Sequence, residues 1–362
     1  MKRTPLLARV VLMTFALTAL VACDTSSSSA LVEDMLGQIE TDVDPAFDYA
    51  FEQSKFVPPE GKTLLIMGQT WEAVDAYTTR FADQPLPGGW SAYWGVSSTD
   101  GLATPFVNEH GDTHHHQGLV DRFPNAVLQS ALWMVGTWDV AQKTAAGDYD
   151  EVIRTFSTWA KGVERPIYLR IGYEFDGPHN ELEPRDYVAA YRRIVAITRN
   201  EGVENVAFVW HSYGSPTYKG YPLSAWYPGD DYVDWVGISL FGHLYATELN
   251  AEANAVFEFA QTHKKPVMIA ETSPVHGIVS ANEHVWDDWF ANLFSLTYRK
   301  NVKAISFITS DWSNYPLATA LGWRDARLQN NALVSEAWFA ETSKERYLKA
   351  SPSLFQQLGY TP

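Results

Sequence analysis

The feature that most constrains the fold is a regular alternation along the chain from residue 64 onward. Short apolar runs rich in β-branched and aromatic residues alternate with longer, more polar stretches. This pattern is typical of βα units around a parallel sheet, whose strands are buried on both faces. Eight such runs are present, at residues 63–67, 91–96, 126–134, 166–172, 205–211, 232–240, 266–270 and 303–308.

Eight strands predict a closed (β/α)₈ barrel that forms one domain over residues 46–362. Between the fourth and fifth runs, residues 185–199 predict an amphipathic helix, with Pro184 before it and Gly202 after it. A doubly wound open sheet is the alternative, but it usually has fewer strands and a glycine-rich phosphate loop after the first one. The sequence has no such loop. In a closed barrel, chemistry is expected at the C-terminal ends of the strands.

The N-terminus indicates export. Residues 10–21 are almost wholly apolar and follow a basic start, which is typical of a signal peptide and too short for a membrane span. They end in Leu20-Val21-Ala22-Cys23, which resembles the lipobox of bacterial lipoproteins. The resemblance implies a signal peptide over residues 1–22 and a lipid anchor on Cys23; an ordinary signal peptide with a chance cysteine is the alternative. The serine-rich segment 23–45 is predicted to be a flexible tether.

Composition narrows the partners. Cys23 is the only cysteine, so no internal disulfide is possible. The formal net charge is −16, and loss of the leader makes it more negative, which argues against nucleic acid and most polyanions. The chain contains 14 Trp, which suits either a Trp-rich core or a cleft in which sugars stack on indole rings. No cofactor is predicted, and a monomer is expected.

Two glutamates carry the chemical prediction. Glu174 follows the fourth run in Arg170-Ile-Gly-Tyr-Glu-Phe-Asp-Gly, and Glu271 ends the seventh. A carboxylate at the end of a buried strand is costly unless it is paired or used. Strands four and seven lie across the mouth of a barrel, and a retaining glycosidase needs two carboxyl groups about 5–5.5 Å apart. One glutamate alone could form a structural ion pair with Arg170. The two together favour catalysis, with Glu174 as acid/base and Glu271 as nucleophile.

These motifs, in their order and spacing, resemble glycoside hydrolase family 26. The resemblance spans residues 64–312 and implies a retaining, endo-acting hydrolase of a β-linked polysaccharide. It rests on Arg170 four residues before the acid/base, Phe175-Asp176-Gly177 after it, Phe208-Val-Trp210, residues 226–237, Met268-Ile-Ala-Glu271-Thr and Trp312.

Two departures bear on the substrate. Mannan-cleaving members usually carry His directly before the acid/base, and here it is Tyr173. They also carry a Tyr after strand six that holds the nucleophile, where this chain reads Ser239-Leu240-Phe241. The string around Glu174 looks more like the family's β-1,3-xylanase branch, so β-1,3-xylan is the expected substrate. The alternatives are β-mannan, another algal β-glycan, or a non-catalytic glycan-binding surface lipoprotein; the presence of both glutamates argues against the last.

Each remaining site prediction concerns a residue that also has a structural explanation. Arg170 is expected to help keep Glu271 ionised, and Glu174 is expected to have a raised pKa. The tryptophans proposed for stacking are equally candidates for the core, and the two histidines could instead be structural. The predicted substrate-binding residues are Arg170, Tyr173, Asp176, Trp210, His211, Phe241, His243, Trp312, Trp94 and Trp138.

The run His114-His115-His116 raises the hypothesis of a metal-binding site. Adjacent histidines lack the i, i+4 spacing that places two ligands on one helix face. We therefore predict an exposed loop after the second strand, bordering the cleft, and no metal site.

Overall fold

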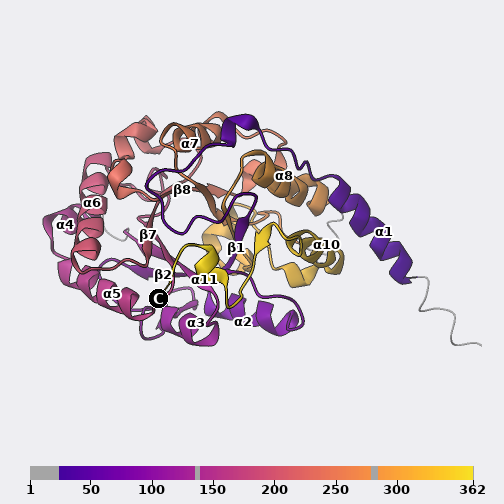
Figure 1. Ribbon diagram of the computed structural model, residues 1–362, viewed down its shortest axis with the longest axis horizontal. Coiled ribbons are helices and arrows are strands. Elements are labelled where there is room, and N and C mark those ends of the chain that lie inside the picture. Colours follow the sequence, from indigo (N-terminus) through magenta and orange to yellow (C-terminus); the bar gives the residue numbers. More distant parts are fainter. Residues whose placement is uncertain (1–23, 135–138, 279–283, 362) are drawn as a thin grey trace, which may run out of the picture.

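The computed structural model describes residues 24–134, 139–278 and 284–361 (Figure 1). Eight parallel strands form a sheet in chain order, and pairing of the first with the last closes it into a barrel. Each predicted run overlaps one of these strands, with ends that differ by a few residues, and the (β/α)₈ prediction is confirmed. The strands are β1 (Thr63–Gly68), β2 (Gly89–Gly95), β5 (Val127–Trp133), β6 (Ile167–Ile171), β7 (Val206–Ser212), β8 (Trp235–Leu240), β9 (Val267–Thr272) and β10 (Ala304–Ile308).

Alternation along each strand divides the apolar side chains between two cores. In β1, Leu64 and Ile66 belong to the core inside the barrel, whereas Leu65 and Met67 belong to the core shared with the helices. Successive side chains of a strand point to opposite faces, and here both faces are covered. This explains why the strands read as unbroken apolar runs.

Helices surround the barrel (Figure 1). The predicted helix 185–199 is confirmed as α6, which begins at Pro184, a residue suited to the first helical position because it has no N–H to leave unbonded. The helices are α1 (Asp24–Gly37), α2 (Trp71–Arg80), α3 (His116–Arg122), α4 (Val140–Ala146), α5 (Asp150–Gly162), α6 (Pro184–Asn200), α7 (Ala251–Thr262), α8 (Ala291–Arg299), α9 (Pro316–Ala320), α10 (Ala332–Thr342) and α11 (Leu354–Gln357).

Three short strands add to the barrel. β11 (Tyr347–Leu348) pairs with the start of β1. β3 (Phe106–Val107) and β4 (Thr113–His114) form an antiparallel hairpin in the connection after β2. Asn108 shapes the hairpin turn, since its side-chain oxygen accepts from the backbone N–H groups of His110 and Asp112. The hairpin therefore holds its polar turn residues in a defined arrangement.

The tether prediction for residues 23–45 is wrong over most of its length. Asp24–Gly37 forms α1, which packs against α10 at the edge of the molecule (Figure 1). Met35 and Ile39 are buried in the main core, and the indole N–H of Trp286 donates to the carbonyl of Met35. These anchors lie after the serine run and hold this segment on the barrel. No helix among the described residues is long and apolar enough to cross a membrane.

The exposed-loop prediction for the histidine run is also wrong. His114 ends β4 and His116 begins α3, and both are buried. His116 is bonded on both ring nitrogens, to the carbonyl of Gly101 and to the hydroxyl of Ser130. Burial lowers the pKa of His116 to about 4, so its ring is neutral and structural. No metal-binding cluster occurs among the residues that the structure describes.

Candidate active site

Glu271 lies in β9 at the mouth of the barrel, and its side chain is almost fully buried. The carboxylate oxygen Oε1 accepts two short hydrogen bonds, one from the guanidinium of Arg170 and one from the hydroxyl of Tyr93, each 2.5 Å long. Charge-assisted bonds of this kind are shorter and stronger than neutral ones. They fix one oxygen of Glu271 and leave Oε2 outside these two bonds.

Arg170 is held in place by aromatic rings and by a histidine. Its guanidinium lies 5.1 Å from the ring centre of Tyr93 and 5.4 Å from that of Tyr173. One N–H is 3.4 Å from Nδ1 of His211, whose Nε2 is 3.0 Å from the hydroxyl of Ser239. Burial and the charge of Arg170 lower the pKa of His211 well below its usual value, so this ring is neutral. His211 therefore supports Arg170 instead of facing a sugar.

Burial and neighbouring charges act in opposite directions on the pKa values of Glu271 and Arg170. Burial raises the pKa of Glu271, Arg170 lowers it, and Glu174 raises it again. Burial alone would lower the pKa of Arg170, but Tyr93 and Glu271 outweigh this and raise it. Arg170 thus stays charged and counteracts the burial of Glu271, although the net direction for Glu271 is upward. Tyr173, directly before Glu174, lies over the guanidinium of Arg170, which bonds Glu271, so the two carboxyl groups belong to one cluster.

Glu174 lies in the turn after β6, where the chain leaves the barrel wall. Its backbone φ is +52°, a left-handed conformation that is uncommon outside glycine and tends to mark functional sites. Its Oε2 is 2.8 Å from Nε2 of His179. Burial disfavours the charged ring, but the bond to Glu174 and the charges of Glu174, Glu271 and Asp176 together outweigh it and raise the pKa of His179. The side chain of Asn180 donates to the backbone carbonyls of Tyr173 and Glu174 and fixes the turn.

Sequence reasoning missed Tyr93 and His179. The residue directly after β8 is Phe241 and not a tyrosine, but Tyr93 from β2 supplies a hydroxyl to Glu271 from another strand. The signal was the two-residue alternation in β2. Trp94 stacks on Phe156 of α5, so its neighbour Tyr93 must face the barrel mouth. No comparable local signal marks His179, which lies in an irregular loop.

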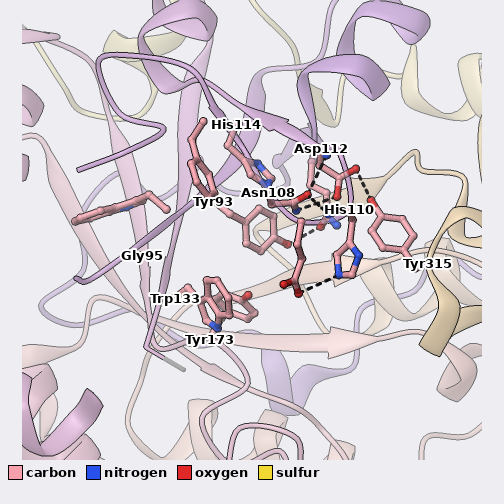
Figure 2. A pocket seen from close by; sticks show the side chains of 13 residues that line it. Tyr93, Gly95, Asn108, His110, Asp112, His114, Trp133, Tyr173 and Tyr315 are labelled. Carbon is pink, nitrogen blue, oxygen red and sulfur yellow. Dashed lines mark hydrogen bonds and ion pairs between the residues drawn. The ribbon is translucent and has the colours of Figure 1, made fainter. Parts of the chain in front are cut away.

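A cavity of about 500 Å³ opens beside Tyr93. Figure 2 shows its lining side chains, which come from β2, the β3–β4 hairpin, the end of β5 and the region after β10. Trp133 is 43% exposed there, and the hydroxyl of Tyr315 donates to Asp112. The lining residues are Gln69, Tyr93, Trp94, Gly95, Phe106, Asn108, Glu109, His110, Asp112, His114, Trp133, Tyr173 and Tyr315.

Three predicted substrate contacts are better explained as structure. Trp210 is fully buried, packs on Phe175 and donates its indole N–H to a backbone carbonyl. Asp176 is buried and accepts bonds from the hydroxyl of Ser212 and the N–H of Tyr213; burial raises its pKa to about 6. Both ring nitrogens of His243 are bonded: Nδ1 accepts from the backbone N–H of Phe241, and Nε2 lies 3.0 Å from the carbonyl oxygen of Gly214. The side-chain nitrogens and oxygens of all three are bonded within the protein.

The other predicted contacts lie near the mouth. Tyr173 and Trp94 line the cavity, although Trp94 is only 3% exposed and its N–H is bonded to Ser130. Trp312 packs edge to face against Phe241 and donates to Ser273, two residues beyond the nucleophile. Trp138 and Cys23 lie outside the described residues.

This arrangement can perform acid/base and nucleophilic chemistry at one point. One carboxylate is oriented by a guanidinium and a phenol, and a second carboxyl group lies close enough to affect its charge. A cavity with an exposed indole and several polar side chains adjoins them. The combination suits the cleavage of a glycosidic bond in a sugar chain.

Comparison with known proteins agrees with this geometry. The family model of glycosyl hydrolase family 26 matches residues 142–306. A β-1,3-xylanase from an Alcaligenes species is 30% identical over 342 residues, covering 87% of this chain and 70% of the xylanase. The β-1,3-xylanase TXYA from a Vibrio species is 29% identical over 342 residues, covering 87% of this chain and 72% of that protein.

Solved structures show the same fold at low identity. A Cellulomonas fimi endo-β-1,4-mannanase double mutant is 14% identical with a TM-score of 0.57, over 87% of this chain and 79% of its own. A family 26 β-mannanase from Bacteroides ovatus is 14% identical with a TM-score of 0.51, over 91% and 96%. With the sequence match to the xylanases, the chain belongs to glycoside hydrolase family 26.

Proposed function

We propose that this glycoside hydrolase cleaves β-1,3-xylan within the chain and with retention of configuration. The observation that carries the mechanism is the fixed carboxylate of Glu271, which Arg170 and Tyr93 bind through the same oxygen. The substrate rests on the two relatives named β-1,3-xylanases and on Tyr173, which stands where mannan-cleaving members usually have His. The mannanase structures support the fold and do not bear on the substrate.

In the first step, Glu271 attacks the anomeric carbon and Glu174 protonates the leaving oxygen. This requires an ionised Glu271, and the guanidinium of Arg170 favours that form. In the second step Glu174 takes a proton from water, which then displaces Glu271 from the sugar. We expect the two carboxyl groups to lie about 5–5.5 Å apart. A crystal structure that places them more than about 9 Å apart would contradict retention.

The two glutamates can be separated by their variants. Glu271→Ala should lose activity on every substrate, because no glycosyl-enzyme can form. Glu174→Ala should lose roughly 10²–10⁴ on polysaccharide, yet still release a good leaving group from an activated aryl glycoside. Added azide should then rescue Glu174→Ala and give the β-glycosyl azide, whereas in Glu271→Ala it should give the α product. If azide rescues neither and both substrates are lost equally in Glu174→Ala, the acid/base assignment is wrong.

The substrate itself is tested by product analysis. Purified protein would be incubated with β-1,3-xylan, β-mannan, β-1,4-xylan and algal galactans, and the products separated by length. We expect short oligosaccharides from β-1,3-xylan alone, present early in the reaction as endo cleavage requires. Preferential cleavage of mannan would favour the β-mannanase alternative, and binding without cleavage of any glycan would favour a non-catalytic role.

We also propose that the protein is exported and held at a bacterial membrane by a lipid on Cys23. The proposal rests on the sequence Leu20-Val21-Ala22-Cys23 and the apolar stretch before it. A polysaccharide too large to enter a cell needs a hydrolase outside the cytoplasm, which agrees with this location.

A further inference from the structure

We propose that the cavity beside Tyr93 binds the glycone side of the substrate, and that it selects an uncharged chain. The proposal rests on the proposed function, because it takes Glu174 as acid/base and Glu271 as nucleophile. It adds the direction in which the chain lies across the site and a class of substituent that the site rejects.

The direction follows from the roles of the two carboxyl groups. The acid/base protonates the oxygen of the departing sugar, so that sugar lies on the side of Glu174. There Glu174 contacts His179, which packs against Tyr213, and none of these three residues lines the cavity. The cavity is instead lined by Tyr93, which bonds Glu271. Tyr173, which precedes Glu174 in the sequence, also lines it, but its ring lies over the guanidinium of Arg170, which bonds Glu271 as well. It therefore extends from the side of the sugar that Glu271 attacks.

The cavity has the parts that a sugar site needs. Trp133, the last residue of β5, is 43% exposed and Phe106 is 37% exposed, and both rings line the cavity. Exposed apolar rings gathered in one concave site are typical of a ligand-binding groove. Polar groups also line the cavity. The carboxylate of Asp112 accepts a hydrogen bond from the side chain of Asn108 on one oxygen and from the hydroxyl of Tyr315 on the other. These bonds hold the polar groups in place before a ligand arrives, as Figure 2 shows.

The charge of the lining excludes anionic sugars. Glu109 and Asp112 both line the cavity, and no Lys or Arg is among the lining residues described. Two histidines line the cavity: His110 lies 3.6 Å from Glu109, and burial lowers the pKa of His114, which favours its neutral ring. A uronate or sulfate on the glycone would face these carboxylates and the nearby Glu271 without a counter-charge, at a cost in binding. An unsubstituted neutral chain meets no such cost.

The first test compares two activated substrates with the same aryl leaving group, a β-xyloside and a β-1,3-xylobioside. The second sugar of the bioside occupies the cavity. Trp133→Ala should lower kcat/KM for the bioside by about tenfold, equivalent to about 1.4 kcal/mol of binding, and leave the monoside unchanged. Leu31→Ala, which removes another exposed apolar side chain on α1, should change neither. An equal loss on both substrates, or no loss on either, would overturn the assignment of the cavity.

The second test concerns charge. Wild-type protein should cleave a neutral β-1,3-xylo-oligosaccharide much faster than the same oligosaccharide with a glucuronate on its non-reducing half. Glu109→Lys should narrow that difference, while Glu258→Lys on α7 should preserve it. Equal wild-type rates on the two oligosaccharides would contradict the charge selection. Failure of the proposed function is distinguishable, because then the wild-type protein would cleave neither the xylosides nor the xylo-oligosaccharides.

Discussion

At the scale of single residues, Tyr93 is the least expected part of the site. Its hydroxyl donates to Glu271 and lies 2.6 Å from the side-chain oxygen of Gln69. Burial and the charge of Glu271 raise the pKa of Tyr93 well above its usual value, so the phenol stays protonated and remains a donor. Tyr93 therefore orients the proposed nucleophile from β2, while the residue directly after β8 is Phe241.

The pH dependence of kcat/KM tests this role. Glu271 must be ionised to attack, and burial raises its pKa, so it becomes protonated at a higher pH than an ordinary glutamate. The acid limb of the profile should thus lie above the usual value of about 4.3. Tyr93→Phe removes a bond that favours the ionised form, so the acid limb should move to still higher pH and kcat should fall. An unmoved acid limb in Tyr93→Phe would leave Tyr93 a packing residue only.

His179 allows a second prediction at this scale. Burial opposes its charged form, but the bond to Glu174 and the nearby carboxylates raise the pKa of His179, so a charged ring forms more readily beside Glu174. The first step needs Glu174 protonated. His179→Gln removes that charge, so the alkaline limb of kcat/KM should extend to higher pH. Measured profiles with the same alkaline limb in both proteins would show that the imidazole does not influence the acid.

At the scale of elements, the strands could be predicted because each is a buried apolar run. The ends of β6 and β9 bring Arg170, Glu174 and Glu271 to one mouth, because the C-terminal ends of all strands in a closed parallel barrel meet at the same face. The connections could not be predicted in this way. The β3–β4 hairpin depends on side-chain bonds within its turn, such as those of Asn108, which no periodicity reveals.

The environment of a tryptophan within a strand could not be predicted from the sequence either. Trp210 and Trp133 both lie in barrel strands, but Trp210 packs toward the helices and Trp133 lies at the open end. Trp210→Ala should destabilise the fold by about 3–5 kcal/mol, as truncation of a buried aromatic does. Trp133→Ala should unfold with nearly the wild-type midpoint. Denaturant titration of both variants checks this contrast, and equal losses of stability would mean that Trp133 is a core residue.

At the scale of the whole molecule, a lipid on Cys23 would be followed directly in the sequence by α1, which is packed against α10. A docked helix would give the anchored domain less freedom than the flexible tether expected from the serine run. Cys23→Ser removes the acylation site, so the protein should leave the membrane fraction and become soluble in the exported compartment. Its kcat/KM on soluble oligosaccharides should stay unchanged, because Glu174 and Glu271 lie in the barrel. Detergent-phase partitioning of both proteins provides the measurement. If wild-type protein and Cys23→Ser partition alike into the aqueous phase, the chain carries no lipid, and the apolar start serves export only.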